Sequence, residues 1–149
     1  MLLLLGAAIA VAASAAPTTT TWQPHEITLT SSVAYSPQDA WRTVQLNASF
    51  TDGSGAALLG VGYWDGGTSW KLRFAPPSAG EWKWHTSCSD VTNSGLHGAS
   101  GSFTAAAYAG TNPLYQHGIL RPNKANRYLE HADGTPFYWL GDVRAKPLI

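Results

Sequence analysis

The stretch that decides the fold is Gly62–Thr86, which reads GYWDGGTSWKLRFAPPSAGEWKWHT. On both sides of a proline-containing break, large apolar side chains alternate with polar ones. Strict alternation places successive side chains on opposite faces of a strand, so the stretch predicts two half-buried β-strands. Before the first of these strands, Asp65-Gly66-Gly67 predicts a hairpin turn that connects it to the segment ending at Trp64. Glycine supplies the positive φ that such a turn requires. The alternating apolar residues are Trp70, Leu72, Phe74, Trp82 and Trp84.

Similar alternation extends outward from this stretch and predicts further strands. No window shows a helical period. Short strands at roughly 10-residue spacing, separated by turn signals, favour an all-β fold: an immunoglobulin-like antiparallel β-sandwich over residues 22–107. A closed β-barrel is the structural rival. The additional strands are expected at His25–Ser32, Trp41–Thr51, Leu58–Trp64 and Ser102–Ala107. The core is expected to contain Val44, Leu46, Phe50, Leu72, Phe74, Trp82 and Trp84.

The first 15 residues have the features of a secretory signal peptide. A short apolar run ends in Ala13-Ser14-Ala15, which fits a signal-peptidase site. The run is shorter than the about 20 apolar residues that a membrane span needs. We therefore expect a secreted, extracellular protein that has no membrane segment in its mature form. Residues 16–21 are expected to form a disordered spacer after the signal peptide. A disordered alanine-rich leader is the alternative.

Composition narrows the possible partners. The chain of 149 residues has a formal net charge of zero, and only 12% of its residues are charged, so we expect no nucleic-acid partner. Cys88 is the single cysteine, which excludes an internal disulfide. The five histidines show no metal-ligand spacing, so we expect neither a metal nor another cofactor. Asn47-Ala48-Ser49 is a glycosylation sequon on the polar face of a predicted strand.

The central stretch resembles a domain of unknown function at the N-terminus of secreted glycoside-hydrolase-like proteins. That family combines an aromatic-Asp-Gly hairpin with an Arg-Phe-x-Pro strand end and a Gly-x-Trp strand start, all present in Gly62–Thr86. Trp22 with His25-Glu26-Ile27 at the start, and Gly101-Ser102-Phe103 at the end, also fit. The resemblance implies an accessory domain of a carbohydrate-active protein.

A second resemblance begins after a linker at residues 108–126. Residues 127–142 contain an Asp-Gly turn and the aromatic segment Phe137–Leu140, which ends in Gly141-Asp142. They are similar to the entry into the (β/α)₈ barrel of apiosidase-like and related hydrolases. The resemblance implies the stub of a TIM barrel whose remainder is missing here, with the missing C-terminal barrel as partner domain. Residues 143–149 depart from the family and are interpreted as a divergent tail.

The resemblance implies that the parent protein is a glycoside hydrolase, whereas this 149-residue chain is not expected to be catalytic, and we assign it no catalytic residue. The alternative function is a carbohydrate-binding module that holds a polysaccharide on exposed tryptophans. The candidate sugar contacts are Trp64, Asp65, Trp70, Arg73 and Asp142. Asp65 and Arg73 have competing structural roles, in a hairpin turn and in a surface ion pair.

Overall fold

The computed structural model describes residues 18–140. The predicted signal peptide, Asp142 and the divergent tail therefore lie outside the described residues. Within them, strands dominate and the two helices are short, which confirms an all-β fold. The immunoglobulin-like topology and the barrel stub remain predictions. None of the helices in residues 18–140 is long and apolar enough to cross a membrane.

One seven-stranded sheet forms the main body, which we call the β domain (residues 18–108). Its strand order is β1-β7-β6-β3-β4-β5-β2. All neighbouring pairs are antiparallel except β1 with β7. The strands are β1 Thr18–Thr20, β2 His25–Thr30, β3 Leu46–Asp52, β4 Ala57–Trp64, β5 Ser69–Phe74, β6 Gly80–Cys88 and β7 Ser100–Ala106.

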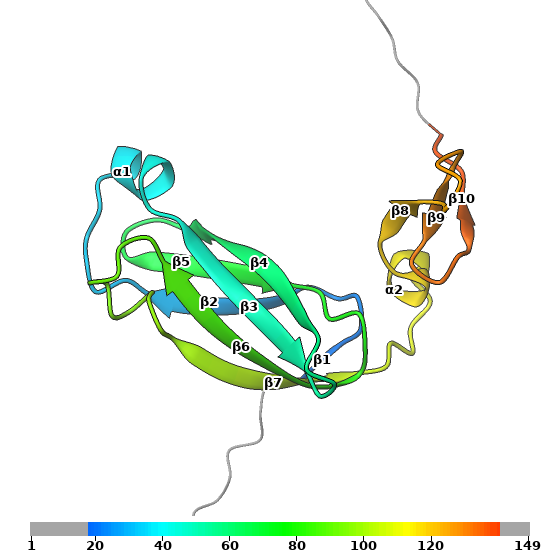
Figure 1. Ribbon diagram of the computed structural model, residues 1–149, viewed down its shortest axis with the longest axis horizontal. Coiled ribbons are helices and arrows are strands. Elements are labelled where there is room, and N and C mark those ends of the chain that lie inside the picture. The colour runs from blue at the N-terminus through cyan, green and yellow to red at the C-terminus, as the bar shows by residue number, and fades with distance from the viewer. Residues whose placement is uncertain (1–17, 141–149) are drawn as a thin grey trace, which may run out of the picture.

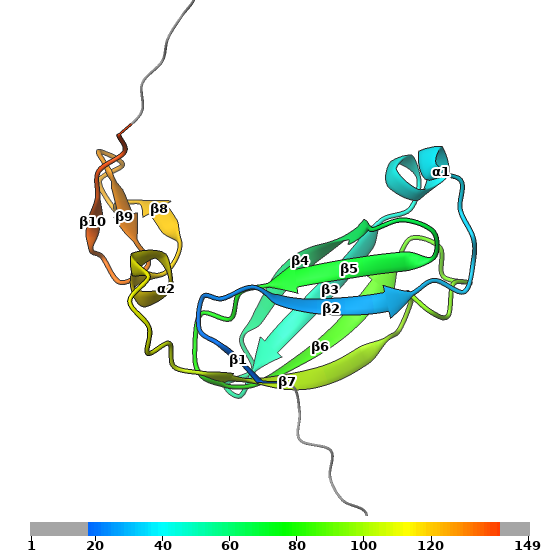
Figure 2. The same ribbon diagram turned by 180° about the vertical axis from the view of Figure 1, so that it is seen from behind.

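The sheet bends at β4, and this bend creates two layers. Residues 57–61 of β4 pair with β3, whereas residues 62–64 pair with β5. As a result β2 and β5 lie across from β3, β6 and β7 (Figures 1 and 2). Two glycines permit this close approach: a Cβ on Gly60 would lie 2.8 Å from Phe50, and one on Gly62 would lie 2.5 Å from Leu46.

The core lies between the two layers and is rich in aromatic rings. The rings of Phe50 on β3 and Phe74 on β5 stack with centroids 4.0 Å apart, which joins one layer to the other. Trp82 packs against Phe74 at 5.0 Å. The predicted core is confirmed for every residue except Trp84, which is only half-buried. It packs at the edge of the core, where its indole fills the space beside Gly101.

The strand predicted over Trp41–Thr51 is wrong in its start: β3 begins at Leu46, and Trp41 and Arg42 are the last residues of a helix, α1 (Pro37–Arg42). Ser36 caps it by accepting a hydrogen bond from the Asp39 backbone N–H (3.2 Å), and Pro37 occupies the first turn. One and a half turns are too short to show a helical period. The cap and the proline are local signals of a helix start and could have located it.

The loop between β6 and β7 is fixed to the β2–α1 loop by the buried amide of Asn93. Its Nδ2 donates to Ser31 Oγ (2.7 Å) and to Tyr35 Oη (2.8 Å). Its Oδ1 accepts from the backbone N–H groups of Ser32 (3.1 Å) and Gly95 (3.2 Å). Every polar atom of this amide is thus satisfied, as burial requires.

Two segments expected to be irregular contain regular structure. The predicted spacer at residues 16–21 contributes β1, whose three threonines pair in parallel with β7. The predicted linker at residues 108–126 contains a helix and a strand. They join the C-terminal unit, a small three-stranded antiparallel sheet with a helix beside it, which lies near the β1–β2 turn (Figures 1 and 2). Its elements are α2 Pro113–His117, β8 Leu120–Pro122, β9 Leu129–His131 and β10 Pro136–Phe137.

Candidate functional site

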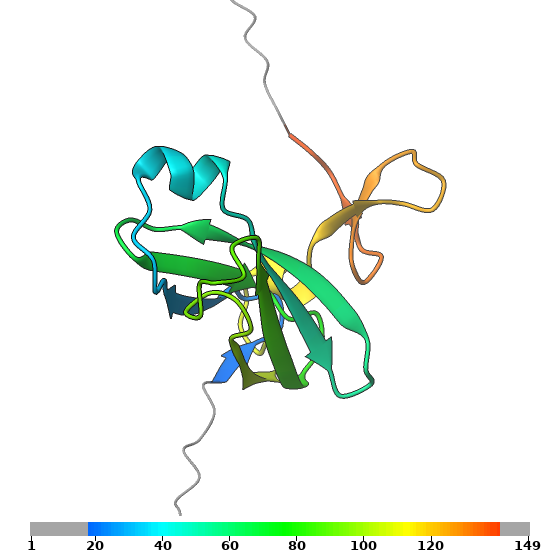
Figure 3. The same ribbon diagram turned by 60° about the vertical axis from the view of Figure 1, so that its left-hand side comes forward.

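A groove lies where α1 meets the β4–β5 hairpin, at the end of the β domain away from the C-terminal unit. We call it the α1 groove. Figure 3 shows α1 placed beside this edge of the sheet. Aromatic side chains from both elements line it, together with small residues: Trp41, Val44, Gly62, Tyr63, Trp64 and Trp70.

The two faces of α1 explain why Trp41 is at this groove. Ala40 is 1% exposed and is the buried residue of the helix, so it fixes α1 on the domain. The next residue, Trp41, consequently points outward and is 66% exposed. The Arg42 guanidinium lies 4.8 Å from the centroid of the Trp41 ring, a cation–π contact on one face of the indole.

The hairpin contributes two tryptophans that face each other in register. Trp64 pairs with Trp70 at the end of β4 and β5. Trp64 is half-buried, and its Nε1 donates to the Gly67 carbonyl in the turn (2.9 Å). Trp70 is 1% exposed, so it is not one of the exposed tryptophans that the predicted carbohydrate-binding module would use. Its Nε1 is the one buried side-chain polar atom in residues 18–140 without a hydrogen-bond partner.

Beside the groove, the outer face of β2, β4 and β5 carries a connected set of charges. Lys71 Nζ lies 2.9 Å from Asp65 and 3.0 Å from Glu26, and Arg73 Nε lies 2.9 Å from Glu26. Arg73 also covers the Tyr63 ring at 5.2 Å. Lys71 first, and then Arg73, lower the pKa of the Glu26 carboxyl by hydrogen bonding to its charged form. The network therefore favours the ionised form of Glu26.

The structure divides the predicted sugar contacts between these two features. Trp64 and Trp70 line the groove, whereas Asp65 and Arg73 belong to the ion-pair network. Asn47 is apart from both, exposed on β3 opposite Val61 of β4. Trp41 was missed because it was assigned to a strand. Tyr63, Glu26 and Lys71 were missed because their roles depend on pairing between strands.

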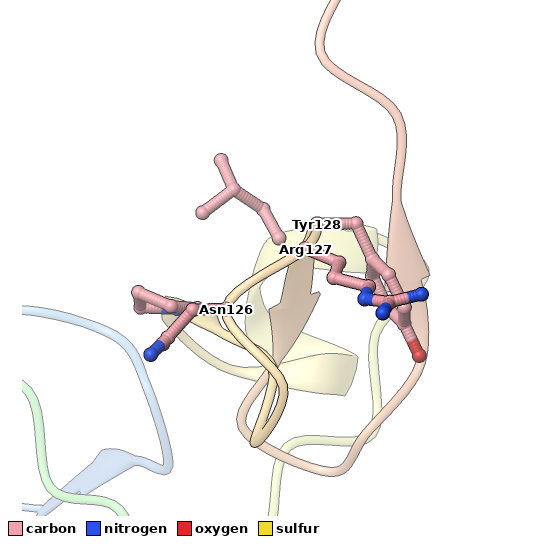
Figure 4. Close-up of a pocket in the computed structure, with 5 residues that line it drawn as sticks. Asn126, Arg127 and Tyr128 are labelled. Carbon is pink, nitrogen blue, oxygen red and sulfur yellow. The ribbon is translucent and has the colours of Figure 1, made fainter.

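The C-terminal unit has a second hollow, in the β8–β9 turn, lined by Pro122, Asn126, Arg127, Tyr128 and Leu129. Figure 4 shows that the side chain of Asn126 points away from those of Arg127 and Tyr128. Polar groups that bind one ligand must converge on it. This hollow therefore lacks the arrangement of a binding site. Residues 18–140 also contain no group of three or more histidine, cysteine or acidic residues placed to hold a metal ion.

Comparison with known proteins finds a family model that matches part of the chain. Residues 18–89 match a family described as a domain of unknown function, DUF5060. This DUF5060 segment contains β1 to β6, and with them both elements of the α1 groove. No curated protein matches the chain.

A solved structure resembles more of the chain than the DUF5060 segment. It is a crystal structure of a "putative glycoside hydrolase" from Bacteroides vulgatus ATCC 8482, with a TM-score of 0.64 and 28% sequence identity. The alignment covers 82% of this chain and 21% of the Bacteroides protein, so this chain spans about a fifth of that protein's length. Residues 1–108 could not supply such coverage, so the alignment includes part of the C-terminal unit. Together these findings support a glycoside-hydrolase-associated domain of unknown function.

Proposed function

We propose that this chain supplies an accessory, non-catalytic domain of a secreted carbohydrate-active protein. The observation that carries the proposal is the structural match to the Bacteroides protein, of which only 21% corresponds to this chain. A region that forms a minor part of a hydrolase-like protein is suited to support a larger catalytic domain. The proposed partner is a (β/α)₈ barrel in the same longer protein, and the proposed class of the β domain is an immunoglobulin-like sandwich.

The chemistry of the carboxylates in the β domain supports the non-catalytic part of this proposal. A retaining glycosidase needs one carboxyl group that stays protonated as the general acid, which requires a raised pKa. Glu26 and Asp65 share the Lys71 ammonium, and this contact lowers the pKa of Glu26. The shared ammonium therefore stabilises the charged form of a carboxyl that would need to be neutral.

Secretion is supported by the apolar run that ends at Ala13-Ser14-Ala15. The exposure of Asn47 on β3 leaves room for a glycan at the sequon. Expression of the full sequence in a secreting eukaryotic host tests both points. We expect a medium fraction with a new N-terminus near residue 16, and a mass decrease on glycosidase treatment that Asn47→Gln abolishes. Retention of an unprocessed chain inside the cells would contradict the proposed localisation.

An activity assay tests the accessory role. The purified 149-residue chain is incubated with aryl glycosides and with plant-wall polysaccharides, and we expect no turnover above the buffer rate. The matched variants are Glu26→Gln and Asp65→Asn, which remove one carboxylate each. Turnover by the wild-type chain that disappears in either variant would overturn the proposal and make the charged face a catalytic site.

A further inference from the structure

We propose that the α1 groove is a binding site for a neutral, hydroxyl-rich oligosaccharide, with Trp41 as its stacking platform and the Trp70 indole N–H as its hydrogen-bond donor. This inference rests on the proposed function and deepens it, because it gives the accessory domain a ligand and a site.

The first observation is the exposure of Trp41. Trp41 is 66% exposed and is not needed to anchor its helix, which is fixed by Ala40, so its indole is available to a ligand. Arg42 covers one face of the indole and restricts its orientation. The opposite face is left as a flat apolar surface, which suits the C–H face of a sugar ring.

The second observation is the unpartnered N–H of Trp70. Buried polar groups in proteins are almost always hydrogen-bonded, and an exception requires an explanation. Trp70 lines the same groove as Trp41, and no acceptor in the described residues reaches its Nε1. An oxygen from outside the chain can accept a hydrogen bond from this N–H group, and a sugar hydroxyl supplies such an oxygen. Because Trp70 is 1% exposed, a ligand oxygen reaches this N–H only when the neighbouring side chains of the groove move aside.

The third observation concerns charge and selects a neutral ligand. The cations beside the groove are already neutralised: Lys71 contacts two carboxylates and Arg73 contacts Glu26. An anionic ligand would have to displace these pairs, at the cost of leaving a carboxylate unpaired. Arg42 is the remaining cation near the groove, and it lies over the Trp41 ring. Acidic oligosaccharides therefore serve as the contrasting arm of the test.

In the experiment, the full chain is titrated with neutral gluco- and xylo-oligosaccharides and, separately, with oligogalacturonate. Calorimetry measures the heat of binding in each titration. Chain labelled with ¹⁵N at tryptophan is titrated in parallel, so that each indole N–H is observed separately. We expect saturable binding of a neutral oligosaccharide and a shift of the Trp70 indole resonance. Trp41→Ala should weaken binding at least tenfold. Trp139→Ala is the matched control, because Trp139 is 71% exposed but lies on the C-terminal unit, and it should leave affinity unchanged.

Trp70→Phe keeps an aromatic ring but removes the donor, and it should also weaken binding at least tenfold. If Trp70→Phe lowers the melting temperature so far that the chain unfolds, Tyr63→Ala at the rim provides the second test. The proposal is overturned if no neutral oligosaccharide binds at millimolar concentration, if Trp41→Ala leaves the affinity unchanged, or if only oligogalacturonate binds. Such a failure is distinct from failure of the accessory role, which only hydrolysis by the chain would show.

Discussion

The indole of Trp22 lies against Gly118, and this contact joins the β domain to the C-terminal unit. A Cβ on Gly118 would lie 2.6 Å from Cε2 of Trp22 and 2.9 Å from Cβ of Ala132. Trp22 has a φ of 64°, unusual for a non-glycine residue, and its backbone N–H donates to the Pro76 carbonyl (2.9 Å). The surrounding hydrogen bonds thus hold Trp22 in a conformation that places its ring on the glycine.

The first prediction follows from this contact. Gly118→Ala introduces a side chain where the Trp22 ring lies, at a φ of +81° that disfavours any L side chain. We expect the two parts of the chain to separate more readily, without loss of the β-domain core. Limited proteolysis should show cleavage in residues 108–113 increased several-fold. Gly53→Ala is the control, because a Cβ there meets nothing within 4 Å. Equal cleavage of Gly118→Ala and wild type would refute the docking role of Trp22.

The second prediction compares two tryptophans on the same domain. Trp82 is 1% exposed and packs on Phe74, so Trp82→Ala should lower the free energy of unfolding by about 3–5 kcal/mol. Trp41→Ala removes the same atoms from a mostly exposed site and should change it by less than about 0.5 kcal/mol. Denaturant unfolding of both variants measures the difference. Similar losses for the two variants would mean that Trp41 has a structural role and is not free for a ligand.

The third prediction concerns Asn93, which is 0% exposed. Asn93→Ala leaves the part-buried N–H groups of Ser32 and Gly95 without their acceptor and removes the donor to the buried Ser31 hydroxyl, and a buried group left unpaired costs about 1–3 kcal/mol. We expect a loss of at least about 2 kcal/mol, together with faster amide exchange in both loops. Thr92→Ala, which removes an exposed hydrogen bond to Asp90, should cost far less. An Asn93→Ala variant as stable as Thr92→Ala would show that water replaces the lost amide.

The fourth prediction is a pH dependence within the C-terminal unit. The Asp133 carboxylate lies 2.7 Å from His117 Nδ1, and this hydrogen bond lowers the pKa of Asp133 to about 2. Because the folded-state pKa lies below the ordinary value near 3.8, the stabilisation is complete above that value and is lost as pH falls towards 2. Hydrogen exchange in residues 113–137, corrected for intrinsic rates, should therefore accelerate between pH 4 and 2.

Asp133→Asn tests the origin of this acid sensitivity. The variant should show the faster exchange already at pH 5, with little further change on acidification. Asp39→Asn is the control for removal of one exposed carboxylate, because Asp39 lies on α1 at the far end of the molecule (Figure 1). An acid transition in residues 113–137 that is identical in wild type and Asp133→Asn would assign it to other groups.

Sequence reasoning succeeded where the physical signal is local. Alternation of apolar and polar residues located β2, β4, β5, β6 and β7 and most of the core, because side chains in a strand point alternately to the two faces. The Asp65-Gly66-Gly67 turn also follows from local chemistry, and both glycines have positive φ. Sequence reasoning failed at Pro37–Arg42, where alternation that began in the true strand was extended backwards over a capped helix.

Only some residues of the candidate site could be predicted from the sequence. Trp64 and Trp70 were predicted as sugar contacts, yet the alternation of residues could not show that Trp64 is half-buried and Trp70 fully buried. Trp70 belongs to the buried core cluster, and Tyr35, which is distant in the chain, packs edge-on against its ring at a centroid distance of 6.3 Å. Arg73 was likewise expected as a contact, but its partner Glu26 becomes a neighbour only when β2 pairs with β5.

The sequence by itself determined most strands of the β domain, the turn between β4 and β5 and most of the apolar set that fills the core, since these depend on neighbours within a few residues. Only the tertiary structure decided the parallel pairing of β1 with β7, the division of β4 between two partner strands, the α1 groove and the seating of Trp22 on Gly118. Each of these joins segments far apart in the chain. Their free energy comes from contacts that exist only after the two layers have closed on a common core, so no local pattern encodes them.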